Sequence, residues 1–324
     1  MLTEEIRLYN DRENVTLTTY VIAEKGELRD QGKRPAVLIC PGGGYFSCSD
    51  REAEPVALKF ASMGYHAFVL RYSTYGEGKN FFPDFSVHIT PKDKTKYPAP
   101  IWDIGKAMLY IRDHADIWMV DMERIAVCGF SAGAHNSAMY SVYWDSPLLT
   151  KQFGVVADML KPAAVLLGYT LSDYAYMEKL NRNEMDERFF NASQIAYLGD
   201  SCPSEERLRE VSPALNVTEH TPPTFLWATA ADTSIPVQHS LRMAHALADH
   251  KVPFEIHIFE EGDHGLSLST QATAVSKKMI NKDAAKWIEL ADCWLEKRFA
   301  LNLPEKSEFE RMIENRSMLS RLCN

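Results

Sequence analysis

A serine flanked by glycines stands near the middle of the chain, between an apolar run and a helical pattern. Residues 124–135 have the sequence R-I-A-V-C-G-F-S-A-G-A-H, so Ser131 is the third residue of a G-x-S-x-G motif. Glycines such as Gly129 and Gly133 permit a sharp turn from strand to helix that holds a serine in a strained conformation. A helix beginning directly after Ser131 would point amide donors at a nearby oxyanion. This pattern predicts Ser131 as a nucleophile.

A serine hydroxyl is a weak nucleophile, so this chemistry needs a histidine base and an acid that fixes the imidazole. The chain offers His264 and Asp232, each directly after a β-branched or aromatic run, 254–259 and 224–229 respectively. Both would lie in loops at the carboxyl ends of strands, where parallel sheets place their sites. Glu261 and Asp263, beside the histidine, are the rival candidates for the acid.

A second glycine-rich stretch supplies candidate oxyanion donors. Residues 38–46, L-I-C-P-G-G-G-Y-F, follow a strand-like run with bare backbone that can approach a substrate carbonyl. Neither G-x-x-x-x-G-K-[ST] nor G-x-G-x-x-G is present, which argues against a phosphate-binding loop. We expect the amides of Gly43, Gly44 and Ala132 to hold the oxyanion. Tyr45 and Phe130, next to these donors, are the candidate substrate-binding side chains.

His135 lies one helical turn after Ser131 and so close to the predicted site. We expect it to pack against a neighbouring strand loop rather than to act in catalysis.

The elements that would position these residues alternate between strand and helix, which predicts an α/β fold with a mostly parallel central sheet and helices on both faces. The predicted strands are 16–22, 36–40, 66–72, 124–128, 163–168, 224–229 and 254–259. The predicted helices are 101–115, 132–144, 237–249, 282–299 and one that a capping box at Ser49 to Glu52 opens and that reaches Met63. Because 16–22 alternates most clearly, it is predicted as an antiparallel edge strand.

Three segments depart from this alternation. Residues 76–100 are polar, aromatic and proline-rich, as is typical of lids and binding walls. Residues around 171–221 form an insertion that is either a small cap over a pocket or a solvated pair of surface helices. A capping box at Ser307 to Glu310 predicts a C-terminal helix that packs on the body or on a second subunit. We therefore predict one domain over 1–300 and a helical extension over 301–324.

Composition narrows the class of protein. The 324 residues carry a net charge of −9, which argues against nucleic-acid binding. No apolar run approaches the roughly 18 residues that span a membrane, and the first residues do not resemble a secretory signal. Six cysteines without C-x-x-C spacing are typical of reduced thiols, so we expect a cytoplasmic protein without a membrane partner.

Several linked stretches together resemble the α/β-hydrolase carbohydrate esterases, a group that includes acetyl xylan esterases and esterase/lipases related to hormone-sensitive lipase. They are P-G-G-G-Y (41–45), R-E-A-E-P-V-A (51–57), L-R-Y-S (70–73), G-F-S-A-G (129–133), D-T-S-I-P (232–236) and G-D-H-G-L (262–266). The resemblance implies an α/β-hydrolase fold with Ser131 as nucleophile, His264 as base and Asp232 as acid, and activity without a metal or an organic cofactor. Pro41 stands where relatives of hormone-sensitive lipase usually have histidine, which favours the sugar-esterase branch.

These inferences predict a serine carboxylesterase that removes small acyl groups, acetyl above all, from carbohydrate esters through an acyl-enzyme. A feruloyl or lipid esterase or a peptidase of the same fold is an alternative, because the triad does not encode the leaving group. A non-catalytic ligand-binding relative is a second alternative. The expected partner is a small-molecule or oligosaccharide ester, and a homo-oligomer is possible.

Overall fold

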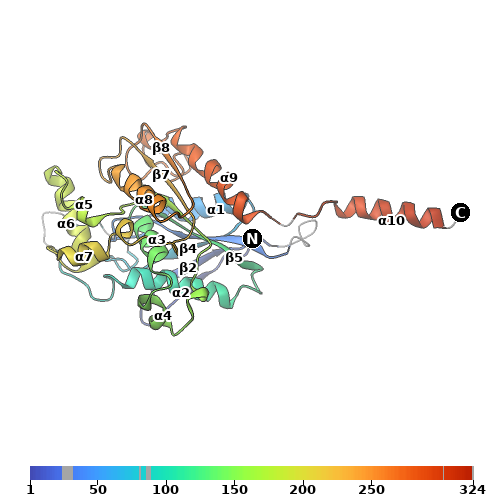
Figure 1. Ribbon diagram of the computed structural model, residues 1–324, viewed down its shortest axis with the longest axis horizontal. Coiled ribbons are helices and arrows are strands. Elements are labelled where there is room, and N and C mark those ends of the chain that lie inside the picture. Colours follow the sequence, from blue (N-terminus) through green and yellow to red (C-terminus); the bar gives the residue numbers. More distant parts are fainter. Residues whose placement is uncertain (24–31, 80–81, 85–88, 302, 323–324) are drawn as a thin grey trace.

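An eight-stranded sheet forms the centre of the computed structural model, which describes residues 1–23, 32–79, 82–84, 89–301 and 303–322 (Figure 1). The strands are β1 (Glu5–Arg7), β2 (Thr16–Tyr20), β3 (Arg34–Cys40), β4 (His66–Arg71), β5 (Val120–Phe130), β6 (Ala164–Gly168), β7 (Thr224–Thr229) and β8 (Phe254–Phe259), in the order β1-β2-β4-β3-β5-β6-β7-β8. From β4 to β8 all neighbours are parallel, while β1 and β2 are antiparallel to their neighbours. This is the mixed sheet of an α/β-hydrolase fold, as predicted.

Helices cover both faces of the sheet because the central strands are apolar on both sides. In β3, Leu38 belongs to the apolar cluster that includes residues of α2 (Ala99–Asp113) and α3 (Ala132–Tyr143). Val37 and Ile39 belong to the cluster of α1 (Glu54–Ser62) and α9 (Trp287–Phe299). The helices are α1 (Glu54–Ser62), α2 (Ala99–Asp113), α3 (Ala132–Tyr143), α4 (Pro147–Phe153), α5 (Tyr174–Met177), α6 (Glu184–Leu198), α7 (Glu205–Glu210), α8 (Gln238–Asp249), α9 (Trp287–Phe299) and α10 (Glu308–Leu322). Short 3₁₀ turns are η2 (Asp50–Glu52), η3 (Ala157–Met159), η4 (Pro213–Leu215), η5 (Lys277–Met279) and η6 (Ala284–Lys286). The helix predicted over 282–299 is thus divided into η6 and α9.

The predicted edge position of 16–22 is wrong. In the structure β2 pairs with β4 on one side and with β1 on the other, so β1 is the edge strand. With only three residues and a largely exposed pattern, β1 has no apolar run that sequence periodicity could detect.

The insertion between β6 and β7 contains α5, α6 and α7, which Figure 1 shows grouped at the opposite end of the molecule from α10. We call this group of helices the cap. The 76–100 segment has no regular element before α2 among its described residues; positions 80–81 and 85–88 lie outside them.

The two predicted capping boxes have different outcomes. At the C-terminus, Ser307 Oγ accepts a hydrogen bond from the Glu310 amide, and the Glu310 carboxylate accepts one from the Ser307 amide, as predicted. At Ser49 the box does not form, because the Glu52 carboxylate instead accepts a hydrogen bond from the Gly42 amide, and α1 begins only at Glu54. The predicted helix therefore starts later, after the short turn η2.

Helix α10 projects away from the rest of the molecule in Figure 1. Its apolar residues Phe309, Met312 and Ile313 are exposed, so the structure does not show the predicted packing on the body. Among the described residues, none of the helices combines the length and the apolar composition that a membrane span requires.

Candidate active site

The turn between β5 and α3 holds Ser131 in a backbone conformation that non-glycine residues rarely adopt, with φ 52° and ψ −119°. The flanking glycines allow the close packing of this turn. A Cβ atom on Gly129 would lie 2.3 Å from the Gly133 carbonyl oxygen, and one on Gly133 would lie 2.1 Å from the Cys40 carbonyl oxygen. Backbone strain of this kind costs on the order of 1–3 kcal/mol and persists where the surrounding structure fixes it.

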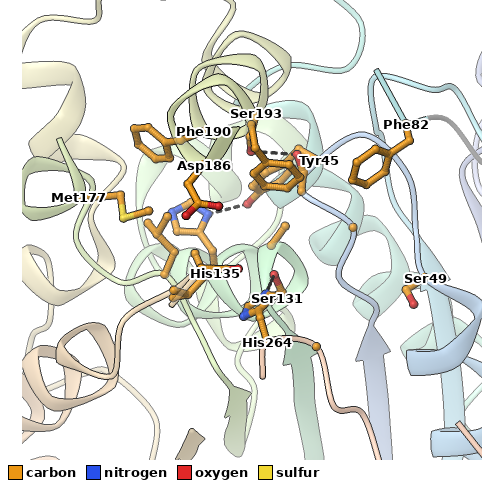
Figure 2. Close-up of a pocket in the computed structure, with 18 of the residues that line it drawn as sticks. Tyr45, Ser49, Phe82, Ser131, His135, Met177, Asp186, Phe190, Ser193 and His264 are labelled. Atoms are coloured by element: carbon orange, nitrogen blue, oxygen red, sulfur yellow. Dashed lines mark hydrogen bonds between the residues drawn. The ribbon is translucent and has the colours of Figure 1, made fainter. Parts of the chain in front are cut away.

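A continuous chain of hydrogen bonds joins Ser131, His264 and Asp232 (Figure 2 shows the first link). Ser131 Oγ lies 2.7 Å from His264 Nε2, and His264 Nδ1 lies 2.7 Å from Asp232 Oδ2. The other carboxylate oxygen, Oδ1, accepts hydrogen bonds of 3.0 Å from the amides of Ser234 and Ile235. In this arrangement the imidazole Nδ1–H donates to Asp232, which leaves Nε2 free to accept the serine proton.

The rival acids lie elsewhere. Glu261 and Asp263 are exposed, whereas the Asp232 side chain is fully buried. Parallel strands explain this placement, because β5, β7 and β8 deliver their following loops to the same edge of the sheet.

The electrostatic surroundings of His264 favour its protonated form. Burial lowers the pKa of the imidazole, but the charge and hydrogen bond of Asp232 and the charge of Glu52 outweigh burial and raise it above 6.5. A base with such a pKa both accepts the serine proton and is stabilised as imidazolium during the reaction.

The glycine loop after β3 lies beside Ser131. Gly43 has φ +135°, and a Cβ there would lie 2.1 Å from the Ser47 carbonyl oxygen, so only glycine fits. Among the described residues, the amides of Gly43, Gly44 and Ala132 have no acceptor. The Gly44 carbonyl accepts a hydrogen bond of 2.9 Å from the Ser193 hydroxyl of α6, which ties this loop to the cap.

The two predicted substrate-binding residues, Tyr45 and Phe130, lie in different surroundings. Tyr45 lines the cavity above Ser131, and its hydroxyl donates to His135 Nδ1 at 2.6 Å (Figure 2). His135 Nε2–H donates in turn to the Val211 carbonyl at 2.8 Å, so neither nitrogen is available to Ser131. Burial lowers the pKa of His135 to about 4, which keeps the ring neutral. His135 therefore supports Tyr45.

Phe130 requires a correction. Its side chain is fully buried in the apolar cluster of α1 and α9, with its ring 5.6 Å from that of Trp287. Because side chains alternate along a strand, Phe130 points to the same face as Ala126 and Cys128, away from the cavity. The prediction that Phe130 contacts the substrate is wrong.

A cavity of about 590 Å³ opens above Ser131 and His264. Its walls are largely apolar, and Figure 2 shows Phe82 on one side and Met177 and Phe190 on the other. The cap contributes Tyr174, Met177, Met185, Asp186, Phe189 and Phe190 to the lining of this cavity, and Arg182 comes from the turn between α5 and α6. Helices α5 and α6 thus form one wall of the cavity, which is the arrangement that the cap interpretation of 171–221 expects.

Sequence reasoning missed these cap residues, although the paired phenylalanines Phe189 and Phe190 inside a charged helix were a usable signal. Another missed residue is Glu52, whose buried carboxylate lies at the same cavity. Among the described residues, no group of three or more His, Cys, Asp or Glu side chains could hold a metal ion.

The fold and this site define the class as an α/β hydrolase of the carboxylesterase type. Solved structures agree: the chain is similar to the α/β hydrolase MGS-M1 from a deep-sea metagenome library (32% identity, 93% of this chain and 99% of that one, TM-score 0.67). It is also similar to the carboxylesterase Cest-2923 of Lactobacillus plantarum (27% identity, 93% and 99% covered, TM-score 0.74). An acetyl ester-xyloside bifunctional hydrolase of Caldicellulosiruptor lactoaceticus matches with 28% identity, 91% and 96% coverage and a TM-score of 0.69.

The chain belongs to the BD-FAE family, whose pattern matches residues 27–247. Curated relatives include endo-1,4-β-xylanase B of Butyrivibrio fibrisolvens, 31% identical over 74% of this chain and 34% of that protein. The acetylxylan esterase of Xylanibacter ruminicola is 23% identical over 72% of this chain and 42% of that protein. The chain thus spans less than half the length of these two relatives.

Proposed function

We propose that this protein is a serine esterase that removes acyl groups, acetyl foremost, from carbohydrate esters. The observation that carries the proposal is the hydrogen-bonded chain from Ser131 through His264 to Asp232, placed at the floor of an open cavity and beside free amide donors. Hydroxyl, imidazole and carboxylate in this order are what an acyl transfer to serine requires.

The geometry leads to a two-step reaction. His264 Nε2 takes the proton of Ser131 Oγ while the oxygen attacks the ester carbonyl, and the amides of Gly43, Gly44 and Ala132 hold the resulting oxyanion. The tetrahedral intermediate collapses, the bond to the alcohol oxygen breaks, and His264 returns the proton to the departing sugar hydroxyl. Water, deprotonated by the same imidazole, then releases the carboxylic acid and restores the serine.

The choice of a carbohydrate ester is supported by the relatives. One of them is named an acetylxylan esterase, one an acetyl ester-xyloside bifunctional hydrolase and one an endo-1,4-β-xylanase. The cavity is compatible with a sugar, because the apolar C–H faces of a pyranose pack well on aromatic side chains such as Phe82 and Phe189.

The same apolar wall favours a second candidate, an esterase for larger or aromatic acyl groups. A cavity of about 590 Å³ is much larger than an acetyl group needs, and its walls include several aromatic rings and two thioethers. If the wall holds the acyl group, activity rises with acyl size. If the wall holds the sugar, activity falls beyond acetyl.

A panel of substrates separates these alternatives. We would measure kcat/KM for 4-nitrophenyl acetate, butyrate and octanoate, for methyl ferulate and for acetylated xylo-oligosaccharides. The proposal predicts the highest value for acetyl esters, release of acetate from the oligosaccharides, and a loss of roughly 10⁴-fold or more in the Ser131→Ala variant. Equal hydrolysis by Ser131→Ala and wild type would contradict the serine mechanism, and preference for ferulate would select the second candidate.

A variant of the wall tests what it holds. Phe189→Ala removes an aromatic ring from the cavity and leaves Ser131, His264 and Asp232 in place. We expect a KM for acetylated oligosaccharides several-fold higher, with kcat/KM for 4-nitrophenyl acetate nearly unchanged. The exposed Phe309 of α10 offers a matched control, since Phe309→Ala should change neither value.

A further inference from the structure

The buried carboxylate of Glu52 lies between two loops of the site. Its side chain is almost inaccessible, with 3% of the residue exposed. Oε2 accepts a hydrogen bond of 2.7 Å from the Gly42 amide, directly before the predicted oxyanion donors. Oε1 accepts a hydrogen bond of 2.5 Å from the Tyr169 hydroxyl. Each carboxylate oxygen therefore holds one donor from a different part of the chain.

Tyr169 extends this link to the loop that carries His264. Its oxygen accepts a hydrogen bond of 3.0 Å from the Ser267 amide, and its ring lies edge-on to the His264 imidazole with centroids 5.1 Å apart. Burial and then the charge and hydrogen bond of Glu52 raise the pKa of Tyr169 well above 10, so the phenol remains a donor. One connected set of hydrogen bonds thus runs from the glycine loop to the histidine loop.

The neighbouring Arg51 reinforces the same connection. Its guanidinium donates to the carbonyl of Gly265 at 2.7 Å and to that of Thr273 at 2.6 Å, while the Ser267 hydroxyl donates to the Arg51 carbonyl at 2.6 Å. The turn η2 that contains Arg51 and Glu52 is therefore fixed to the histidine loop by both its side chains and its backbone.

Backbone strain and close packing surround Glu52. Tyr169 has φ 39° and Ser267 has φ 54°, in the left-handed region that non-glycine residues seldom occupy. A Cβ on Gly42 would lie 2.8 Å from Glu52 Oε2 and 2.9 Å from Ser131 Cβ, so residue 42 fits beside Glu52 and Ser131 only because it is glycine. Strained residues persist where several contacts determine their position. Here Ser267 is bonded to Tyr169 and to the Arg51 carbonyl, and Tyr169 is bonded to Glu52.

We propose that Glu52 is a positioning residue of the esterase site, which fixes the oxyanion loop relative to the loop of His264 by holding the Gly42 amide and the Tyr169 hydroxyl. This inference rests on the proposed serine mechanism. Burial of a carboxylate has a large desolvation cost, and apolar packing alone could join two loops without that cost. The Glu52 carboxylate, in contrast, accepts hydrogen bonds from the Gly42 amide and the Tyr169 hydroxyl at once. Its negative charge also acts on the His264 imidazole, which becomes positive during the reaction.

Glu52 acts on His264 in two ways, by positioning the loops and through its charge. The charged and titratable groups around the imidazole are Asp232, hydrogen-bonded to Nδ1, and Tyr169, whose ring lies edge-on to it. Glu52 is hydrogen-bonded to the Tyr169 hydroxyl, and the Arg51 guanidinium is bound to the carbonyl of Gly265, the next residue. The neutral Ser131 hydroxyl lies on Nε2. Glu52 raises the pKa of His264 in the same direction as Asp232 does. Loss of this charge should therefore move the acid limb of the activity profile to lower pH.

Glu52→Gln tests the proposal because glutamine keeps the size and one acceptor but loses the charge and the second acceptor. We expect kcat for 4-nitrophenyl acetate to fall roughly 10-fold to 100-fold with KM within about threefold, a smaller loss than complete removal of an oxyanion donor causes. The acid limb of kcat/KM should move to lower pH. Glu54→Gln is the matched control: the same substitution two residues away, on an exposed side chain, should leave kcat, KM and the pH profile unchanged.

Tyr169→Phe provides a second variant that keeps the carboxylate and its bond to Gly42. Its kcat should fall several-fold while the acid limb stays in place, since the Glu52 charge remains. This variant also decides the matter if Glu52→Gln does not fold. A merely structural role would lower the thermal midpoint of both variants but leave kcat per labelled active site and the acid limb at their wild-type values, and that result would overturn the proposal.

Failure of the proposed function looks different. If wild type hydrolyses no ester, or if Ser131→Ala is as active as wild type, the serine mechanism is wrong and the role of Glu52 falls with it. If wild type is active, Ser131→Ala is inactive and both Glu52→Gln and Tyr169→Phe match wild type, only the positioning role is overturned.

Discussion

Substitution of Asp232 by asparagine should reverse the protonation pattern of His264 without disturbing the packing. The structure fixes which way the asparagine would lie. Oδ1 of residue 232 accepts two backbone hydrogen bonds of 3.0 Å, from Ser234 and Ile235, so only the carbonyl oxygen of the amide fits there. The NH₂ group must then occupy the Oδ2 position, 2.7 Å from His264 Nδ1.

An NH₂ group at that distance donates to Nδ1, so the imidazole proton moves to Nε2. Nε2–H cannot accept the proton of Ser131, and the base is lost although every side chain is in place. Loss of the correct tautomer in a serine triad costs about 10⁴-fold in kcat, or about 5 kcal/mol of transition-state stabilisation. We expect a loss of that order for Asp232→Asn, with KM changed little.

The assay is steady-state hydrolysis of 4-nitrophenyl acetate by wild type and Asp232→Asn, with the thermal midpoint of each measured alongside. Asp263→Asn is the matched control, because it makes the same change in an exposed residue next to His264 and should retain full activity. If Asp232→Asn kept more than a tenth of the wild-type kcat, or if Asp263→Asn lost as much as Asp232→Asn, the assignment of the acid would be wrong.

Three further predictions concern the oxyanion loop, the base and the buried histidines. Gly43→Ala places a Cβ 2.1 Å from the Ser47 carbonyl oxygen, so the loop must move, and kcat per folded protein molecule should fall about 100-fold or more. Because its partners raise the pKa of His264, the acid limb of kcat/KM should have its midpoint above pH 6.5, and a midpoint below 6 would contradict the electrostatic account. Burial lowers the pKa of His66 and His135 to about 4 and that of His239 to about 3. Since these folded-state values lie below the unfolded value near 6.5, the unfolded chain binds more protons, and stability is lost as the pH falls from about 6.5 toward 4, or toward 3 for His239. At pH 5 the protonation of each histidine lowers the free energy of unfolding by about 2 kcal/mol. Unfolding by urea at pH 7 and pH 5 measures the difference, and equal stability at the two values would refute it.

The placement of the candidate triad could be predicted because it depends on local patterns. Ser131, Asp232 and His264 each follow an apolar strand run, and parallel strands bring the loops at their carboxyl ends to one edge. The buried position of Phe130 could also have been predicted, because the alternation of side chains along a strand puts it on the same face of the sheet as Ala126 and Cys128. Its nearness to Ser131 in sequence obscured that alternation.

The role of Glu52 could not be predicted because its partners are distant in sequence. Gly42 is 10 residues away and Tyr169 is 117 residues away. The pattern S-x-x-E favours a capping box at both sites. The box forms at Ser307, where the described residues offer no competing tertiary donor, but not at Ser49, where the Gly42 amide binds the Glu52 carboxylate. A local rule fails here because a tertiary hydrogen bond replaces it. The short strand β1 was not predicted for a different reason, because it has too few apolar residues to form a pattern.

The central claim is that Ser131 becomes acylated, and its most direct test is to observe the acyl-enzyme. Wild-type protein mixed with 4-nitrophenyl acetate, quenched in acid within milliseconds and analysed by mass spectrometry should carry one acetyl group, located to Ser131 by peptide mapping. His264→Ala and Ser131→Ala should carry none. Turnover of the ester with acetylation at another residue, or equal acetylation of Ser131 in His264→Ala, would contradict the account.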